Sequence, residues 1–387
     1  MENKHKGINT RCTHSGNLED ERFRGAVSPI YVSTSYAYED VDIKRYPRYF
    51  NTPNQEALCR KMAALENTET ALIFGSGMAA VSTALLAFVQ SGDHVVLSEH
   101  SYGGTQNLIR EEFDKFRIEY TFIAEPTVAA YRQAIRENTR VLYLETPSNP
   151  LMQITDLEGV AELARKKGLV TMIDNTFASP VNQNPADFGI DLIIHSATKY
   201  MGGHSDICAG VVMGSTEHID RIFQLAKNMG GSLSDYTVWL LERSIKTMGL
   251  RVKAQSQNAL ELARFLQTCP EVNRVYYPGL EDHPDHELAK KQMKAFGGML
   301  SFELAPEVDL GEFTHSLKLV KASMSLAGVE STLTLPSQTS HALLTEAQRK
   351  AAGIEEGLIR FSSGIEDIED LKEDLLQALR KATHSLA

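Results

Sequence analysis

The chain has 387 residues, of which 42% are hydrophobic and 23% charged, with a formal net charge of -11 at pH 7. This length allows a large core and predicts two or three domains, which argues against a one-domain binding module. The acidic charge balance argues against nucleic acid or an anionic membrane surface as the main partner.

Neither the apolar runs nor the cysteines indicate export. No apolar run reaches the roughly 18 residues of a membrane span, and the first 20 residues lack the apolar core of a signal peptide. The four cysteines lie far apart, without C-x-x-C or zinc-ligand spacing, at Cys12, Cys59, Cys208 and Cys269. We interpret His283 and His286 as part of a solvated turn. We therefore expect a cytoplasmic protein with reduced thiols, no metal, and no membrane or nucleic-acid partner.

Residues 1–45 show no helical period and are rich in Ser, Thr, Tyr and Pro. They predict an extended arm that lies on another surface, such as a second subunit. Five short runs rich in Val, Ile, Leu, Tyr and Phe follow, with helical stretches between them, at 70–74, 94–98, 140–145, 169–174 and 191–196. Near-continuous apolar strands that alternate with helices predict an α/β fold with a mostly parallel sheet covered on both faces.

The pattern changes near residue 246. Residues 297–304 and 357–364 resemble strands. The C-terminal stretch carries apolar residues at spacings of three and four, typical of one face of an amphipathic helix, at Ile368, Leu371, Leu375, Leu379 and Ala382. The prediction is an arm at 1–45, a large α/β domain at 46–245 and a smaller C-terminal α+β domain at 246–387.

In such sheets, ligands bind beyond the carboxyl ends of the strands. The first run ends at Phe74, and "GSGM" follows before a long apolar helix that begins near Met78. Backbone N–H groups and the positive end of the helix dipole would then face one point, which favours a phosphate cradle. Taken by itself, "GSGM" is explained equally well as an ordinary turn between a strand and a helix.

The stretch "HSATKYMGGHSD" places Lys199 after small hydroxyl residues at the end of an apolar run. Burial lowers the pKa of a lysine and leaves a nucleophilic amine, which can form a Schiff base. Ser196 and Thr198 could bind phosphate oxygens. A surface lysine on a loop is the alternative, but the neighbours of Lys199 are small and uncharged.

Asp174 ends another apolar run, where an unpaired carboxylate would be unfavourable. A pyridinium N–H would supply the missing cation. Together with a lysine Schiff base and a phosphate cradle, this combination is what pyridoxal phosphate requires. Tyr102, in "SYGGT", is positioned to stack on the cofactor ring, whereas a tyrosine of the core is its alternative interpretation.

These motifs, together with "IDNTFASP", "ETPSNP", "SLAGVES" and "GLIRFSSGIED", resemble the Cys/Met-metabolism family of pyridoxal-phosphate enzymes from about Thr13 to Leu379. The similarity is strongest to the cystathionine gamma-lyase and gamma-synthase group. The resemblance implies a type I aminotransferase-like fold. It also implies a homotetramer, built as a dimer of dimers with active sites shared between subunits.

Residue by residue, the resemblance implies that Lys199 forms the Schiff base, Asp174 contacts the pyridine nitrogen and Tyr102 stacks on the ring. It implies that the phosphate is bound by side chains and backbone groups of Ser196, Thr198, Gly77 and Met78. Lys199 would also remove the α proton of the substrate and carry protons toward the β carbon.

The resemblance implies further site residues. Tyr46 and Arg48 match a Tyr-x-Arg pair that reaches the phosphate of the neighbouring subunit. Asn149 matches a residue beside the cofactor oxygen and the substrate carboxylate. Arg360, with Ser325, matches a clamp for that carboxylate, to which the arginine fork is suited.

Three departures bear on the substrate. Met324 stands where relatives that act on cystathionine tend to carry an acid that meets the distal ammonium. Gly104 stands where methionine gamma-lyases tend to carry Cys, which argues against that branch. The usual "NPT" after the Tyr-x-Arg is "NTPN" here. Met324 therefore becomes a candidate substrate-binding residue.

Three functions remain open. The favoured hypothesis is a carbon–sulfur lyase that acts by α,γ-elimination on cystathionine-like sulfur amino acids and releases a thiol, ammonia and a 2-oxo acid. A γ-replacement transferase that joins an O-acylhomoserine to cysteine or sulfide is the alternative. A non-catalytic regulatory protein on the same fold is the third.

Overall fold

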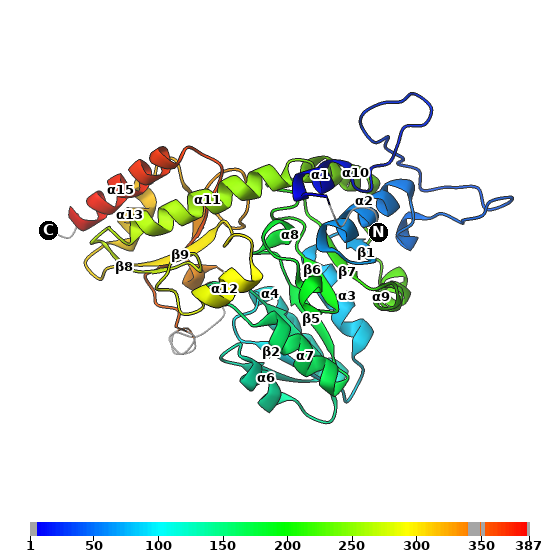
Figure 1. The fold of residues 1–387 in the computed structure, drawn as a ribbon, viewed down its shortest axis with the longest axis horizontal. Coiled ribbons are helices and arrows are strands. Elements are labelled where there is room, and N and C mark those ends of the chain that lie inside the picture. The colour runs from blue at the N-terminus through cyan, green and yellow to red at the C-terminus, as the bar shows by residue number, and fades with distance from the viewer. Residues whose placement is uncertain (1–5, 340–348, 350–352, 385–387) are drawn as a thin grey trace.

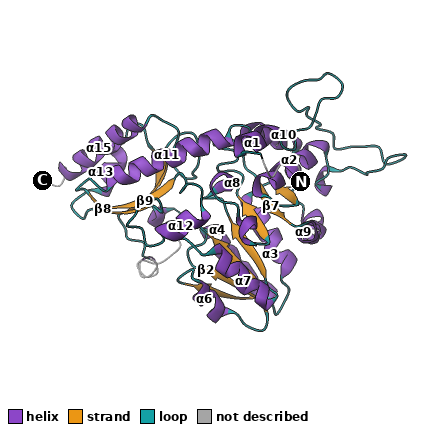
Figure 2. Cartoon of the chain, viewed as in Figure 1, coloured by secondary structure: helices purple, strands orange, loops and turns teal. Residues whose placement is uncertain are grey.

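The computed structural model describes residues 6–339, 349 and 353–384. Within them the strands form two separate sheets, one of seven strands and one of five. Figure 1 shows the larger sheet in the cyan-to-green part of the chain and the smaller one at the opposite end, with a long helix, α11 (Met248–Leu266), running between the two parts. Figure 2 shows helices packed around both sheets.

The larger sheet has the strand order β1-β7-β6-β5-β4-β2-β3. Its strands are β1 (Thr70–Phe74), β2 (His94–Ser98), β3 (Glu119–Ile123), β4 (Thr139–Glu145), β5 (Val170–Asp174), β6 (Leu192–His195) and β7 (Gly210–Gly214). All five predicted strands lie here within two residues of their expected ends. The β7 strand pairs antiparallel with β1 and with β6, so among the described strands of this sheet it alone is reversed. The five predicted strands therefore end at one edge.

The smaller sheet has the order β10-β11-β12-β9-β8. Its strands are β8 (Val272–Tyr276), β9 (Met299–Leu304), β10 (Lys321–Ala322), β11 (Thr332–Thr334) and β12 (Leu358–Ser362). The two strands predicted in this part are β9 and β12. The predicted amphipathic helix is α15 (Ile368–His384). Leu371, Leu375, Leu379 and Ala382 are buried with residues of α11 and of this sheet, and Ile368 is partly buried beside them.

The remaining helices are as follows. They are α1 (Ile8–His14), α2 (Pro53–Glu66), α3 (Gly77–Phe88), α4 (Gly103–Leu108), α5 (Asp114–Phe116), α6 (Val128–Ala134), α7 (Leu157–Lys167), α8 (Ser179–Asn182), α9 (Thr216–Met229), α10 (Asp235–Ile245), α12 (His286–Gln292) and α13 (Leu310–Ser316). Short 3-10 or π turns lie at Pro47–Tyr49, Ile109–Phe113, Pro185–Phe188 and Pro336–Gln338. None of the helices in the described ranges combines the length and apolar character needed to cross a membrane.

Burial on both faces of the larger sheet explains its apolar strands. In β4, Val141 and Tyr143 pack into one cluster with α3 and α9, whereas Leu142 and Leu144 pack into the other with α2 and α7. Successive side chains of a strand point to opposite faces, so a strand covered on both sides must be apolar throughout. This confirms the α/β class and the prediction of a mostly parallel, covered sheet.

The N-terminal segment differs in one place from the expected extended arm, because it contains the helix α1. Arg11 of this helix is buried and donates hydrogen bonds from Nη1 to Ala64 O at 2.9 Å and to Asn67 Oδ1 at 2.8 Å. These contacts lie more than 50 residues away in the sequence, so α1 is stabilised by tertiary packing rather than by a local period. Beyond α1 the segment projects from the body as long loops without helix or strand (Figure 1).

The predicted division at residues 45 and 245 stays a prediction. The two sheets lie on either side of α11, whose first residue is Met248.

Candidate active site

A cavity of about 620 Å³ opens at the edge where the parallel strands end. Its inner wall comes from the larger sheet and its outer wall from the C-terminal part of the chain. Eleven of the thirteen predicted site residues line it: Gly77, Met78, Tyr102, Asn149, Asp174, Ser196, Thr198, Lys199, Met324, Ser325 and Arg360. The predicted site is thus assembled from segments more than 280 residues apart.

Lys199 is half-buried in this cavity, one turn beyond the end of β6. Its Nζ donates a hydrogen bond to Ser325 Oγ at 2.8 Å. Burial, together with the nearby Arg360 guanidinium, lowers the pKa of Lys199 to about 8, although Cys208 and Asp174 oppose the shift. A substantial fraction of the amine is therefore unprotonated and nucleophilic near neutral pH.

Asp174 ends β5 on the floor of the cavity and is 9% exposed. Its Oδ1 accepts a hydrogen bond from Thr176 N at 3.0 Å. Burial raises the pKa of Asp174, while the hydrogen bonds from Thr176 and the electrostatic influence of His195 and Lys199 act in the opposite direction. A carboxylate in this position favours a cation that enters the cavity.

The start of α3 and the loop before Lys199 lie close together. Ser76 caps the helix, because its Oγ accepts a hydrogen bond from Ala79 N at 3.1 Å. A Cβ on Gly77 would lie 2.9 Å from Ser196 Cβ, so only glycine allows the two segments to approach this closely. The N–H groups of the first helical turn thus point toward the same space as the Ser196 side chain.

The two hydroxyls of this cradle differ. Ser196 Oγ has no hydrogen-bond partner among the described residues, so it is free to bind an anion. Thr198 Oγ1 instead donates to Ala209 O at 3.2 Å and accepts from Ala209 N at 3.0 Å. Its proton must turn away from Ala209 O before it can reach a ligand.

Arg360 reaches the cavity from β12 and is 6% exposed. Its Nη1 donates to Asn149 Oδ1 at 3.1 Å and its Nη2 to Ser325 O at 3.4 Å. Burial lowers the pKa of Arg360 to about 10, so the guanidinium stays charged at neutral pH. These two contacts hold the fork at the cavity wall, where it can bind a carboxylate in two places.

Tyr102 stands just before α4 and is exposed into the cavity, 46% of its surface being accessible. Its backbone N donates a hydrogen bond to Glu145 Oε2 at 2.6 Å. A Cβ on residue 104 would lie 2.6 Å from Tyr102 Cε1, so Gly104 and the present position of the ring depend on each other. The glycine at position 104, where methionine gamma-lyases tend to carry Cys, therefore leaves the space that the Tyr102 ring occupies.

Tyr46 and Arg48 do not line the cavity of their own chain. Arg48 donates a hydrogen bond to Lys227 O, and its guanidinium lies 5.7 Å from the centre of the Tyr46 ring. Both residues are at the surface of the N-terminal segment. Their predicted contact with the site of a neighbouring subunit stays a prediction.

The structure adds site residues that sequence reasoning missed. Glu145 is buried beside Asp174 on the adjacent strand, and burial raises its pKa well above the usual range, with Asp174 contributing to the shift. Thr176 contacts Asp174, and Cys208 lines the cavity as an exposed thiol. Glu145 opens the motif "ETPSNP", so its place at a strand end was the signal available.

The residues fit pyridoxal phosphate. The partly deprotonated Lys199 suits its aldehyde, Asp174 suits the protonated ring nitrogen, and the Gly77–Ser196 cradle suits its phosphate. The fold and cavity therefore define an enzyme that holds a cofactor of this class on a lysine.

Comparison with known proteins identifies the family. The family model described as Cys/Met metabolism PLP-dependent enzyme matches residues 9–380, and the chain belongs to this family. Pyridoxal phosphate is therefore its cofactor, and the prediction of an enzyme of cysteine and methionine metabolism is confirmed.

Similar proteins cover nearly the whole chain. A cystathionine gamma-lyase of Bacillus subtilis is 42% identical, covering 96% of this chain and 98% of that protein. A cystathionine beta-lyase of Lactococcus lactis subsp. cremoris is 40% identical over 97% and 99% of the two chains. The crystal structure of cystathionine gamma-lyase from Lactobacillus plantarum, complexed with L-serine, has a TM-score of 0.94 at 36% identity and covers 97% of this chain and 99% of that one. These similarities confirm the predicted fold.

Proposed function

We propose that this enzyme is a carbon–sulfur lyase that removes the γ substituent of a cystathionine-like amino acid and yields a thiol, ammonia and a 2-oxo acid. One observation carries the proposal: the Lys199 amine, with its pKa lowered to about 8, lies between a buried carboxylate and the buried guanidinium of Arg360 in one cavity. The gamma-lyases among the similar proteins support the choice of the γ position.

Substrate binding begins at Arg360. Its fork binds the α-carboxylate of the substrate, and Asn149 and the Ser325 carbonyl keep the guanidinium oriented. Lys199 contacts Ser325 as well, so the bound carboxylate brings the α carbon near the Lys199 amine. The side chain of the substrate then extends toward Met324, which is 75% exposed at the rim.

Lys199 acts as the proton carrier. When bound, pyridoxal phosphate supplies an aldehyde that holds the substrate amine and a ring that stores an electron pair. Lys199 Nζ removes the α proton and then moves a proton at the β carbon, so the γ substituent can leave. Asp174 balances the positive ring nitrogen, Tyr102 covers the ring, and Ser196, Thr198, Gly77 and Met78 bind the phosphate.

The test uses purified enzyme loaded with pyridoxal phosphate and incubated with L-cystathionine, L-cysteine or L-homocysteine. Cleavage of cystathionine at the γ carbon gives cysteine and 2-oxobutanoate, whereas cleavage at the β carbon gives homocysteine and pyruvate. Mass spectrometry distinguishes the products. The lyase proposal fails if no substrate yields a 2-oxo acid or sulfide.

A γ-replacement transferase is the second candidate. Met324 offers the cavity rim no charge to select the distal ammonium of cystathionine, which leaves an O-acylhomoserine as a candidate substrate. An O-acylhomoserine together with cysteine would then give a thioether, and only when both are present. A chain that binds the cofactor but forms neither product would support the non-catalytic alternative.

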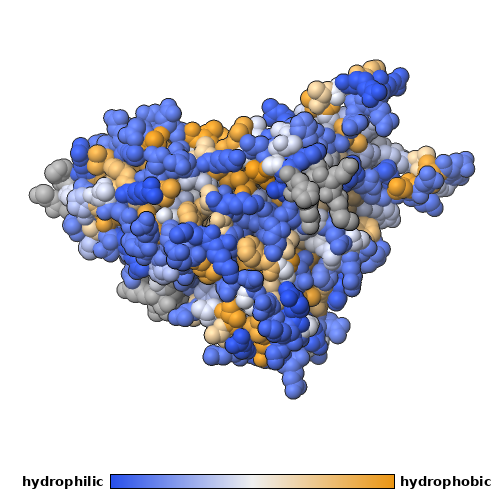
Figure 3. Space-filling model, in the orientation of Figure 1, coloured by the Kyte–Doolittle hydropathy of each residue, from blue (hydrophilic) through white to orange (hydrophobic). Residues whose placement is uncertain are grey.

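We also propose a homotetramer with shared active sites. The N-terminal segment exposes large apolar side chains, among them Phe23, Val32 and Tyr38, each more than 60% exposed. Figure 3 shows orange residues on the loops that project from the body. Such a surface favours burial against a second copy, which would also bring Tyr46 and Arg48 of that copy to the cradle. Light scattering after size exclusion tests the mass, and a monomer would contradict the proposal.

The cytoplasm is the proposed compartment. All four cysteines are free, and Cys12 and Cys59 are buried. This state suits a reducing environment.

A further inference from the structure

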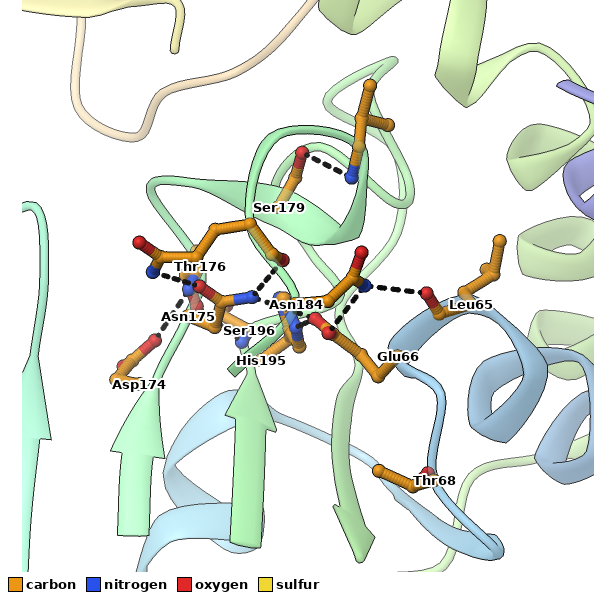
Figure 4. A network of polar contacts seen from close by, with 12 residues as sticks. Leu65, Glu66, Thr68, Asp174, Asn175, Thr176, Ser179, Asn184, His195 and Ser196 are labelled. Atoms are coloured by element: carbon orange, nitrogen blue, oxygen red, sulfur yellow. Dashed lines mark hydrogen bonds and ion pairs between the residues drawn. The ribbon is translucent and has the colours of Figure 1, made fainter. Parts of the chain in front are cut away.

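A buried carboxylate–imidazole pair lies directly behind the cofactor cradle. His195 Nε2 is 2.6 Å from Glu66 Oε1, and the two side chains are 2% and 0% exposed. His195 ends β6, whereas Glu66 is the last residue of α2. Figure 4 shows the pair at the centre of a network of polar contacts.

Glu66 binds more than this one partner. Its Oε1 also accepts from Asn175 Nδ2 at 2.8 Å, and its Oε2 accepts from Asn184 Nδ2 at 3.1 Å. Because both oxygens accept amide protons, His195 Nε2 is the donor in its contact with Glu66. Glu66 is thus a fully buried acceptor for three side chains.

The helix that carries Glu66 does not explain why its carboxylate is buried. A carboxylate at the C-terminal end of α2 faces the negative end of the helix dipole, and its burial away from water adds a desolvation penalty. The three donors that offset this come from β6 and from the segment after β5, up to 129 residues away. A buried polar network of this kind fixes the relative position of its members.

The residues held by the Glu66 network are sequence neighbours of the proposed cofactor-binding residues. Asn175 directly follows Asp174, and His195 directly precedes Ser196, so a single carboxylate holds both strand ends from behind. In front of them, Ser196 N donates to Thr176 Oγ1 at 2.9 Å, and Thr176 N donates to Asp174. The gap between β5 and β6 sets the distance between the ring-nitrogen partner and the phosphate cradle.

We propose that Glu66 and His195 are positioning residues that set the spacing between Asp174 and Ser196 and thereby hold the ring and the phosphate of pyridoxal phosphate at the same time. Neither side chain lines the cavity, so both act through their neighbours. The proposal rests on the roles proposed above for Asp174 and Ser196.

The test measures cofactor binding rather than turnover. Cofactor-free protein is titrated with pyridoxal phosphate, followed by the visible absorption and circular dichroism of the bound cofactor. In His195→Leu, which removes the donor, we expect the dissociation constant to rise about tenfold and the dichroism to change, as for partners of directly ligating groups. His195→Gln retains an N–H donor in a similar place and should restore most of the affinity.

His94 provides the matched control. It is buried in the same sheet and hydrogen-bonded through both ring nitrogens to Thr139 and Thr121, at 2.8 and 2.9 Å, but it begins β2 at the opposite end of the strands. His94→Leu should lower the melting temperature without changing the dissociation constant of the cofactor.

Each outcome decides the proposal. Equal affinity in wild type, His195→Leu and Glu66→Gln would overturn it, as would an equal loss in His94→Leu, which would indicate general destabilisation. If His195→Leu does not fold, the comparison of Glu66→Gln with His195→Gln tests the proposal instead. A dissociation constant for the cofactor that rises in Glu66→Gln but not in His195→Gln supports the positioning role of Glu66 and His195. If the unaltered chain does not bind pyridoxal phosphate at all, the proposed function fails first, which is a separate result.

Discussion

The two walls of the cavity differ in how tightly they are held. The inner wall carries Asp174 and Ser196 at strand ends, and both are hydrogen-bonded to Thr176. Behind them, His195 is hydrogen-bonded to the buried Glu66. The outer wall carries Arg360 on a strand, but Met324 stands 75% exposed at the rim. The inner wall therefore determines which cofactor chemistry is possible, whereas the outer wall determines which substrate is accepted.

The largest predicted effect comes from the inner wall. Lys199→Ala removes the amine that carries the proton, and we expect 2-oxo acid production to fall on the order of 10⁴-fold. Lys166→Ala is the control, because Lys166 is an exposed lysine paired with Glu162 at 3.2 Å. Turnover of Lys199→Ala within tenfold of wild type would show that the chemistry lies elsewhere.

Asp174→Asn tests the charge on the cavity floor. Loss of the carboxylate leaves a buried ring cation unpaired, which costs about 3 to 5 kcal/mol, and we expect cofactor affinity and turnover together to fall about 10²- to 5 × 10³-fold. Asp191→Asn serves as control: Asp191 accepts from Thr171 N at 2.8 Å in the same sheet but does not line the cavity. It should lower stability and leave cofactor affinity unchanged.

The lowered pKa of Lys199 predicts a pH profile for capture of the cofactor. Burial brings the pKa down to about 8, so capture of pyridoxal phosphate by the cofactor-free chain should accelerate about 50-fold between pH 6 and pH 8 and then level off. An ordinary lysine would keep accelerating to above pH 10. Stopped-flow absorption measures this rate, and a profile that rises without a plateau would contradict the assignment.

The same shift acts on stability. The folded chain binds the Lys199 proton more weakly than the unfolded chain, so between about pH 8 and the ordinary lysine pKa of 10.5 the unfolded state holds more protons. The stability of the cofactor-free chain, relative to Lys199→Met, should therefore rise with pH through this window and be lowest below it. Denaturant titrations of both proteins measure the difference.

On the outer wall, Arg360→Lys retains the charge but loses the fork. We expect KM to rise about tenfold, the equivalent of about 1.5 kcal/mol, with a smaller change in kcat. Arg11→Lys is the matched control, since Arg11 is also a buried arginine bonded to carbonyls but lies outside the cavity. An unchanged KM in Arg360→Lys would remove Arg360 from the carboxylate site.

Met324→Glu should have the smallest effect. An acid at this exposed rim can meet the distal ammonium of cystathionine, but exposed pairs contribute about 0.2 to 1 kcal/mol. We expect kcat/KM for cystathionine, relative to homocysteine, to rise by a factor of about 1.5 to 5. Met324→Gln is the uncharged control, and the same ratio measured on it shows whether the rise comes from the charge or from the size of the side chain. A fall in this ratio would indicate that the substrate side chain extends in another direction.

The sequence predicted those parts of the fold and of the site that depend on short stretches of the chain. The apolar runs predicted five strands of the larger sheet because strands covered on both faces must be apolar throughout. Lys199, Asp174 and the glycine turn before α3 could be found because each follows such a run. The edge strand β3 has a half-exposed pattern, and the reversed β7 breaks the alternation of strands and helices, so both were missed.

The rest of the site depends on pairing between distant residues. Glu145 holds the Tyr102 backbone from 43 residues away, and Glu66 meets His195 across 129 residues. Nothing in a single sequence indicates which buried carboxylate meets which donor, because many registers satisfy the same pattern. Contacts with a second chain, as expected for Tyr46 and Arg48, lie equally outside local pattern.

The electrostatic influence of Arg360 on Lys199 has a consequence for synthesis on the ribosome. Lys199 emerges 161 residues ahead of Arg360, whose guanidinium adds to the lowering of the lysine pKa. A nascent chain that has folded only its larger sheet therefore carries a less reactive amine and no clamp for an amino acid. Completion of the C-terminal part supplies both the guanidinium that lowers the pKa of Lys199 and the fork at the cavity wall.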